Sequence, residues 1–401
     1  MDLHSGLPYW PMLHGILTSY PSLSTDTDCE VAILGAGITG AMVAWHLSQA
    51  GYDVLVVDRR HVGMGSTAAS TALLQYELDI SLYDLSKMIG NQAAEKAYLV
   101  CENAVLELGD LCCRLGVGSY YNQTGSFQFA SFQKDIAALK QEFQCRKNVG
   151  FNVEWLESTD IKNKYGIGKS VGIFSETGAG LDAYALTHRL MEDGIRKEKL
   201  RVFDHTEIEE VEYRKKGVIL HTKSNHKIKA GRLVFACGYE SEQFLPFKVQ
   251  QLHSTYAIIS EPIPQQEFWY RNSLIWETAK PYLYVRVTDD YRIAVGGKDT
   301  NGSDPSRRYR QLPAKTRQLE NAFKKLFPLI SFTTDFAWAG SFASTKDGLP
   351  FIGKVVQCPN SYFVMGLGGN GIPFSMVAAD LVKSWLQNKS NSNSSLFCFD
   401  R

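Results

Sequence analysis

The order of apolar and polar residues predicts a strand–turn–helix–strand unit near the start of the chain. A short apolar run at residues 31–34 leads into a glycine-rich turn, and residues 38–49 follow with the pattern of a helix. A second apolar run, at residues 54–57, ends on an acidic residue. Strands and helices that alternate in this way are typical of a parallel sheet, so we expect an α/β fold.

Later segments change between helical and strand-like patterns. Residues 81–118 and 181–197 carry apolar residues at helical spacing, whereas residues 250–300 are rich in strand-like segments. The run at 233–238 is almost wholly apolar, which is typical of a strand buried on both faces of a sheet. A third glycine-rich segment, 366–371, enters a helix with one apolar face. Pieces of the α/β sheet are therefore interrupted twice by other elements.

This order predicts two discontinuous domains, an N-terminal arm and a polar tail that we expect to fray. The expected parts are the arm at 1–28, a nucleotide-binding domain at 29–80, 181–245 and 336–388, a second domain with an antiparallel-rich sheet at 81–180 and 246–335, and the tail at 389–401.

Composition narrows the functional classes. The chain has 401 residues, with 42 basic and 42 acidic side chains, so no overall field favours nucleic acid or an anionic membrane. Eight cysteines lie scattered without a C-x-x-C pair, which predicts reduced thiols and no metal site. Residues 1–28 lack a basic start followed by an apolar run, and no apolar run is of membrane-spanning length. We therefore expect a cytoplasmic protein.

The glycine turn has the spacing of a dinucleotide site. Gly35 permits a tight turn, Gly37 lets the backbone approach a diphosphate, and Gly40 lets the helix pack closely on the strand. The helix N-terminus favours the negative charge of the diphosphate. Asp58 ends the second strand, where an acid accepts hydrogen bonds from ribose hydroxyls. NAD, NADP and FAD all remain open at this point.

Two further segments favour FAD. Arg59 follows Asp58 and could hold the 2′-phosphate of NADP, but the Asp58 carboxylate would repel that phosphate, and solvated arginines are the plainer interpretation. The segment GMGSTAAS at 63–70 offers amides and hydroxyls that can follow an extended cofactor. The segment GLGGNG at 366–371 places a second helix start at the other end of the chain, which suits an anionic reduced ring.

Taken together, these segments resemble the FAD-dependent oxidoreductases of the D-amino-acid-oxidase, glycine-oxidase and sarcosine-oxidase superfamily. The resemblance also includes GRLVFACGYES at 231–241 and DGLPFIG at 347–353, and it covers nearly the whole chain. It implies a Rossmann-like FAD-binding domain of the GR2 type and a discontinuous α+β substrate domain.

The resemblance implies which residues hold FAD along its length. They are Gly35, Ala36, Gly37, Ile38, Thr39, Gly40, Asp58 and Arg59 at the ADP half, Gly65, Ser66 and Thr67 along the diphosphate, Ile208, Ala236, Cys237 and Gly238 at the adenosine end, and Gly366, Gly368, Gly369, Asn370, Gly371 and Ile372 at the flavin ring.

Two departures from the superfamily pattern bear on the chemistry. Some members attach flavin through a cysteine where this chain reads WAGSFASTKDG at 338–348, so the resemblance implies noncovalent FAD. Several members place a lysine beside the flavin for reaction with oxygen. Here Lys298 and Lys346 are the only loose candidates, which leaves oxygen or another acceptor open.

The segment PYLYVRV at 281–287 is the candidate substrate face. Alternation along a strand directs Tyr282, Tyr284 and Arg286 to one side of the sheet. Arg286 could bind a carboxylate through two hydrogen bonds, with the tyrosines around an amine. Packed aromatic rings with a solvated arginine are the alternative.

The leading functional hypothesis is oxidation of the carbon–nitrogen bond of a small amine or amino acid to an imine that water hydrolyses. Alternatives are a flavin dehydrogenase of a 2-hydroxy acid, and a flavin-binding subunit without its own small-molecule activity. Substrate identity, stereochemistry and oligomeric state are open.

Overall fold

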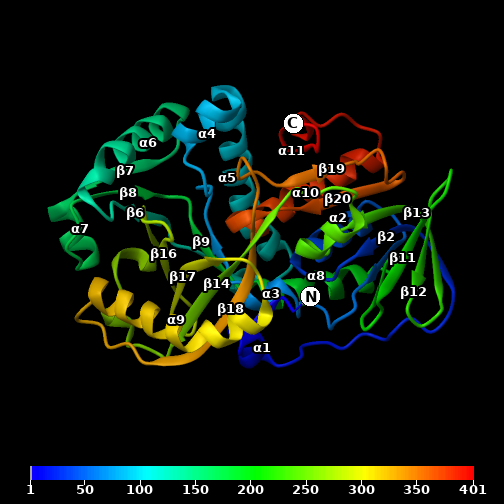
Figure 1. Cartoon of the computed structure of the whole chain (residues 1–401), viewed down its shortest axis with the longest axis horizontal. Helices are drawn as coiled ribbons and strands as arrows, with labels where there is room; N and C mark the ends of the chain where they lie inside the picture. The colour runs from blue at the N-terminus through cyan, green and yellow to red at the C-terminus, as the bar shows by residue number, and fades with distance from the viewer. Residues whose placement is uncertain (1) are drawn as a thin grey trace.

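Two large β-sheets organise the chain, and the computed structural model describes residues 2–401 (Figure 1). Eight strands form one sheet and nine form the other, and a small three-stranded sheet lies apart from both. This mixed α/β architecture confirms the expected fold class.

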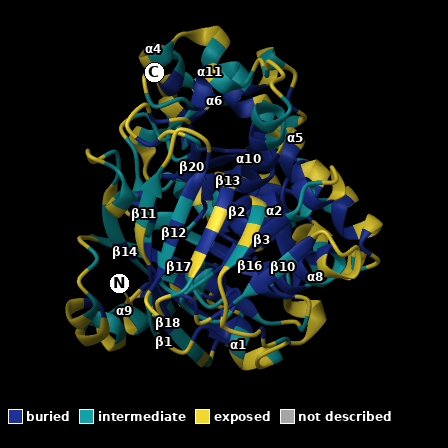
Figure 2. Ribbon diagram, turned by 90° about the vertical axis from the view of Figure 1, so that its right-hand side faces the viewer, coloured by how far each residue is buried: buried dark blue, intermediate teal, exposed yellow. Residues whose placement is uncertain are grey.

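The eight-stranded sheet has a parallel centre made from distant parts of the sequence. The parallel strands of this sheet bury their apolar stretches, which contact other elements on both faces, whereas polar residues along the same strands are partly exposed (Figure 2). These parallel strands are β10 (Leu200–Phe203), β3 (Val54–Val57), β2 (Thr27–Leu34), β13 (Lys227–Phe235) and β20 (Ser361–Met365). The antiparallel strands β12 (Val218–Thr222), β11 (Ile208–Tyr213) and β19 (Phe351–Gly353) complete it.

Three helices pack together beside this sheet. Helix α2 (Ile38–Gln49) follows β2 directly and lies between α8 (Ala183–Arg196) and α10 (Gly371–Leu386). The three helices come from the first, middle and last parts of the chain, so distant segments pack together beside the eight-stranded sheet.

The nine-stranded sheet is almost entirely antiparallel, with helix α9 (Pro305–Leu326) packed against it. Its strands in order are β1 (His4–Gly6), β18 (Thr334–Ser344), β14 (Gln251–Ser260), β17 (Ile293–Asn301), β16 (Leu283–Val287), β15 (Leu274–Glu277), β6 (Ser126–Phe129), β8 (Val171–Ser175) and β7 (Val153–Glu157).

Helices and short strands link the two large sheets. Helix α5 packs along α10, and α4 packs on α5 and α6. The linking elements are α1 (Tyr9–His14), α3 (Ser66–Ala69), β4 (Leu73–Leu74), α4 (Leu82–Ile89), α5 (Asn91–Arg114), β5 (Tyr121–Gln123) and β9 (Ala179–Leu181). Helices α6 (Ile136–Val149) and α7 (Ser158–Tyr165) connect strands within the nine-stranded sheet.

The structure differs from the sequence expectations at both ends of the chain. The expected arm contributes β1 to the nine-stranded sheet, where it pairs with β18. Strand β18 belongs to that sheet, although residues from 336 were expected in the nucleotide-binding domain. The expected frayed tail instead contains α11 (Ser394–Phe397), and Phe397 is fully buried because it packs against Phe374 of α10. The division into two domains stays a proposal.

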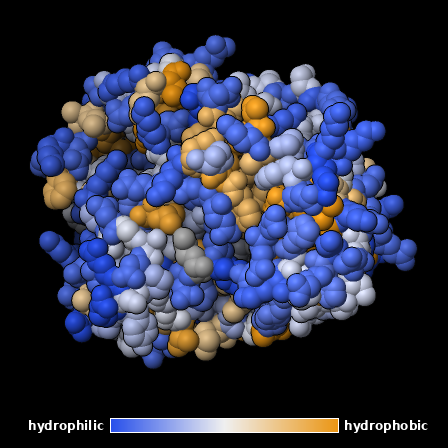
Figure 3. All heavy atoms as spheres, turned by 45° about the vertical axis from the view of Figure 1, so that its right-hand side comes forward, coloured by the Kyte–Doolittle hydropathy of each residue, from blue (hydrophilic) through white to orange (hydrophobic). Residues whose placement is uncertain are grey.

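Among residues 2–401, no helix combines the length and apolar character that a bilayer span requires. The face in Figure 3 is mostly hydrophilic, with apolar residues gathered near its centre.

The close packing at the start of α2 predicts that one added methyl group at Gly40 lowers the stability of the protein. A Cβ at Gly40 would lie 1.8 Å from the Gly35 carbonyl oxygen, so helix and turn must separate. We expect Gly40→Ala to lower the free energy of unfolding by about 2 kcal/mol or more, although alanine is the better helix former. Urea unfolding measures this change. Gly168→Ala is the matched control because its Cβ would meet nothing within 4 Å. Equal stability of the two variants would contradict the close packing.

Candidate functional site

A cavity of about 1230 Å³ is lined by residues of both large sheets. It extends from the βαβ unit, past the glycine-rich segment before α10, to strands β16 and β17. Its volume exceeds the roughly 300–1,000 Å³ typical of a pocket for one drug-sized ligand. The cavity can therefore hold an extended cofactor together with a second molecule.

The glycine turn at one end of the cavity depends on bare backbone. Gly35 has φ of +114°, and a Cβ there would lie 2.5 Å from the Ala236 carbonyl oxygen. Gly37 begins α2, and a Cβ on it would contact the Thr67 hydroxyl at 3.0 Å. That hydroxyl already accepts the Ile38 N–H at 2.9 Å. The positive end of α2 therefore lies beside bare glycine backbone. A narrow anionic group can approach this backbone closely.

Asp58 is held at the end of β3 by two backbone amides. Its Oδ2 accepts the Ala36 N–H and its Oδ1 accepts the Arg60 N–H, each at 2.8 Å. Burial raises the pKa of Asp58, while these hydrogen bonds act in the opposite direction. The carboxylate is therefore fixed in position and keeps lone pairs directed at the cavity, which suits a ribose diol.

Arg59 and Arg60 are ion-paired, not simply solvated. Both guanidinium groups contact Glu240, and the Arg60 Nη1–Glu240 Oε2 distance is 3.0 Å. Both arginines line the cavity at the adenosine end. The glutamate from residues 238–244 therefore ties this second segment to the end of β3.

Most of the sequence-predicted cofactor residues converge on this one cavity. Ala36 and Gly40 do not line it: the Ala36 amide bonds Asp58, and Gly40 packs on Gly35. The lining residues are Gly35, Gly37, Ile38, Thr39, Asp58, Arg59, Gly65, Ser66, Thr67, Ile208, Ala236, Cys237, Gly238, Gly366, Gly368, Gly369, Asn370, Gly371 and Ile372.

The glycine-rich segment before α10 is anchored to the segment after β4. The Asn370 side-chain amide donates to the backbone carbonyls of Gln75 and Glu77 at 2.7 and 3.1 Å. The Gly369 N–H donates to Asp79 Oδ2 at 3.2 Å. These hydrogen bonds place the Asp79 carboxylate beside the glycine-rich segment, at the middle of the cavity.

Of the three predicted substrate residues, the structure brings two to the cavity. Tyr282 and Tyr284 line it, whereas Arg286 does not. Arg286 is buried and donates from Nη1 to the carbonyl oxygens of Ala72 and Leu181 at 2.6 and 3.2 Å. Each residue advances a strand by about 3.3 Å, so Arg286 lies roughly 13 Å further along than Tyr282. Arg286 acts here as a link between β16 and the loop before β4.

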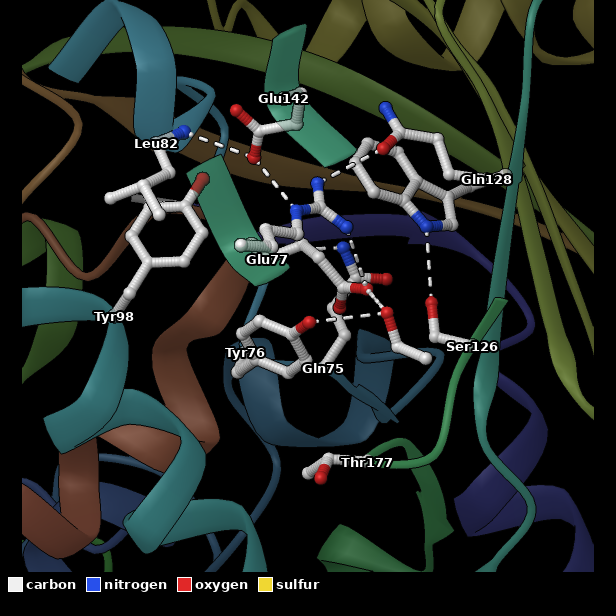
Figure 4. A network of polar contacts seen from close by, with 12 residues as sticks. Gln75, Tyr76, Glu77, Leu82, Tyr98, Ser126, Gln128, Glu142 and Thr177 are labelled. Atoms are coloured by element: carbon white, nitrogen blue, oxygen red, sulfur yellow. Dashed lines mark hydrogen bonds and ion pairs between the residues drawn. The ribbon is translucent and has the colours of Figure 1, made fainter. Parts of the chain in front are cut away.

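A buried network of polar side chains lies next to the segment that Asn370 anchors (Figure 4). Arg146 donates to Glu142 at 2.7 Å, to Gln128 at 3.0 Å and to Glu77 at 3.3 Å. Sequence reasoning missed this group. The spacing of Glu142 and Arg146, four residues apart on one helix, was the available signal.

Two aspartates that the sequence analysis also missed lie among the tyrosines. Asp79 lies near the Tyr282 phenol, and Asp299 lies near the Thr255 hydroxyl. Burial raises the pKa of both carboxyl groups, and the charge of Asp79 raises that of Asp299 further. The substrate end of the cavity therefore combines carboxylates and phenols.

One group of potential metal ligands lies apart from the cavity lining. His61 Nδ1 is 2.9 Å from Asp204 Oδ2, and its Nε2 is 3.1 Å from His205 Nε2. The sequence expectation of no metal site rested on spacing alone, which does not reveal this group.

Comparisons with known proteins agree with the cavity geometry. The profile of the family described as DAO, FAD dependent oxidoreductase, matches residues 30–385. γ-Glutamylputrescine oxidoreductase of Escherichia coli (strain K12) is 24% identical over 92% of this chain and 86% of its own length. YhfW of Bacillus subtilis (strain 168), whose name refers to a Rieske 2Fe-2S iron–sulfur protein, is 22% identical over 95% of this chain and 73% of its own length.

A solved structure shows the same fold. Glycine oxidase from Geobacillus kaustophilus superposes with a TM-score of 0.79 at 15% identity, covering 93% of this chain and 99% of that chain. The family profile, which matches most of the chain, confirms the sequence-based resemblance to this superfamily.

The buried network predicts a pH-dependent loss of stability when its cation is removed. Arg146→Met leaves Glu77 and Glu142 buried without their cation, which costs about 3–5 kcal/mol of unfolding free energy near neutral pH. The pKa of Glu77 is already raised by burial, so in the variant the folded state binds a proton more tightly than the unfolded state. We expect the loss to be smaller at pH 5.5 than at pH 8.

Urea unfolding of both proteins at the two pH values measures this difference. Arg114→Met is the matched control because Arg114 is exposed at the end of α5. A loss for Arg146→Met that is the same at both pH values would argue against buried charge as its cause.

Proposed function

Because the chain belongs to the DAO family of FAD-dependent oxidoreductases, we propose that it binds FAD noncovalently and oxidises the carbon–nitrogen bond of a small amine or amino acid. The main support for the proposal is a single cavity that is lined by the βαβ turn, by the glycine-rich segment before α10, and by Tyr282 and Tyr284. Among the relatives, γ-glutamylputrescine oxidoreductase and glycine oxidase are named for amine or amino-acid substrates.

The residues present fit FAD along the whole cavity. The bare turn at Gly35 and Gly37 and the positive end of α2 suit the diphosphate, and Asp58 suits the adenosine ribose. Gly368 and Gly369 precede α10, where a second helix N-terminus favours negative charge on the ring. When bound, FAD supplies a two-electron acceptor for a hydride from the carbon next to nitrogen.

The chain's own residues bind and orient the amine. Tyr282 and Tyr284 line the cavity, and Asp79 lies near the Tyr282 phenol. Burial raises the pKa of Tyr284 to about 12, so its phenol stays neutral and can donate or accept a hydrogen bond at physiological pH. The amine must lose a proton before the carbon–nitrogen bond is oxidised, and the resulting imine is hydrolysed by water.

Noncovalent binding and a reducing compartment are supported by the cysteines. Cys237 lines the adenosine end, and burial raises the pKa of its thiol to about 12, which keeps it protonated and unreactive. All eight cysteines are free thiols. We propose a cytoplasmic enzyme on this ground.

Purified protein should be yellow and carry about one FAD per chain. Acid precipitation should release the flavin into the supernatant, because no covalent bond holds it. Absorbance and mass of the released cofactor measure this. Colour that stays with the precipitate would show a covalent flavin. A colourless protein that binds NAD would contradict the proposal.

The substrate class is tested by anaerobic bleaching of the bound flavin. We expect bleaching by at least one member of a panel of D- and L-amino acids, N-methyl amino acids, monoamines and polyamines. Bleaching by 2-hydroxy acids alone would favour a hydroxy-acid dehydrogenase. Bound flavin that none of these compounds reduces would favour a subunit of a larger complex.

The electron acceptor is tested by reoxidation. Neither Lys298 nor Lys346 lines the cavity, so we propose an acceptor other than oxygen. Substrate-reduced protein mixed with air should reoxidise more slowly than protein mixed with a dye acceptor such as dichlorophenolindophenol, as followed at the flavin absorbance maximum. Faster reoxidation by air would identify an oxidase.

A further inference from the structure

The substrate half of the cavity carries more carboxylates than basic groups. This half comprises the charged lining residues outside the βαβ unit and outside residues 206–244. The six acids are Asp79, Asp84, Asp135, Glu142, Glu277 and Asp299, and the four basic residues are Lys87, Lys134, Arg146 and Lys280. A bound dication would balance this charge, whereas a zwitterionic amino acid would not.

Two of these carboxylates stand at the centre of the site. Asp79 contacts the Gly369 amide and the Tyr282 phenol. Asp299 comes from the neighbouring strand β17 and is close enough to Asp79 to raise its own pKa. The Asp299 Oδ1 atom is buried and has no hydrogen-bond partner within residues 2–401. Burying a hydrogen-bond acceptor without a donor costs free energy, and the ammonium group of a bound substrate would supply that donor.

The arginines that could bind a substrate carboxylate are already engaged. Arg286 lies outside the cavity lining, and its Nη1 donates to two backbone carbonyls, while its buried Nε has no partner within residues 2–401. Arg146 lines the cavity, but its nitrogen atoms donate to Glu142, Gln128 and Glu77. Lys280 lines this part of the cavity and its charge acts on Asp79, but the carboxylates outnumber the basic groups here, which disfavours recognition of an α-carboxylate.

We propose that the substrate is an alkyl diamine or polyamine whose two ammonium groups bind Asp79 and Asp299. This rests on the proposed FAD-dependent oxidation. Asp79, which contacts the glycine-rich segment, holds the nitrogen that reacts, and Asp299 holds the second. The reactive ammonium releases one proton to solvent, the adjacent carbon passes a hydride to FAD, and a carbon–nitrogen double bond forms. Water then adds to the imine and releases an aldehyde and ammonia.

The proposal is tested on the FAD-loaded enzyme by anaerobic flavin reduction. The compounds are 1,3-diaminopropane, 1,4-diaminobutane and spermidine, with n-butylamine as the matched monoamine and glycine, D-alanine and N-methylglycine as amino acids. We expect the diamines to reduce the flavin, and 1,4-diaminobutane to have a kcat/KM at least tenfold above that of n-butylamine. The amino acids should reduce it at least tenfold less efficiently than the diamine.

Isosteric variants separate charge recognition from folding. Asp299→Asn should raise the KM for 1,4-diaminobutane about tenfold and leave the KM for n-butylamine within threefold, because only the diamine has a second ammonium. Asp79→Asn should weaken the binding of both substrates. Asp110→Asn, exposed on α5, is the matched control and should behave as the unmodified enzyme. FAD content and thermal stability of each variant show whether it is folded.

Each outcome bears on one of the two proposals. Reduction by amino acids but not by diamines would overturn the diamine proposal and leave amine or amino-acid oxidation standing. The same holds if folded Asp299→Asn keeps the full preference for diamine over monoamine. Bound FAD that no compound reduces would overturn the proposed function itself.

Discussion

The site depends on how residues 75–79 are held between the two large sheets. Asn370, at the start of α10, donates its side-chain amide to the carbonyls of Gln75 and Glu77. On the other side, the Glu77 side chain accepts from Arg146 and Ser175. Because these groups are buried, leaving any of them unpaired would cost free energy. The segment therefore has one favourable position, and that position sets the place of Asp79.

The two ends of the cavity use charge in different ways. At the adenosine end, Arg59 and Arg60 are ion-paired with Glu240 and Glu207, and the groups left to bind a cofactor are backbone amides and the fixed Asp58 carboxylate. At the other end, Arg146 is neutralised by Glu77 and Glu142. Asp79 and Asp299 form no ion pair within residues 2–401, although the charge of Lys280 acts on Asp79 and that of Lys315 acts on Asp299. One end presents a neutral cradle for a diphosphate, and the other presents an anionic pocket.

The sequence predicted those parts of the site that are local along the chain. The glycine turn, its helix and Asp58 form one continuous unit, and glycine spacing has a direct geometric meaning there. Asp79, Asp299 and Arg146 come from a loop, a strand and a helix, and only the folded chain brings them together. Alternation along β16 correctly gave Tyr282, Tyr284 and Arg286 a common side, but it carries no information on where along that side the cavity ends.

Arg286 shows why this distinction matters for substrate recognition. A guanidinium on the same face as two cavity tyrosines looks like a carboxylate anchor until its surroundings are known. In the structure, burial lowers the pKa of Arg286, and its partners are neutral carbonyls together with the Trp10 ring, whose centroid is 5.6 Å away. Moving this group to a substrate would leave those carbonyls without donors, a cost comparable to the gain from a new ion pair. The groups left to contact a substrate at the tyrosines are then the Asp79 and Asp299 carboxyls, with the charge of Lys280 acting on Asp79.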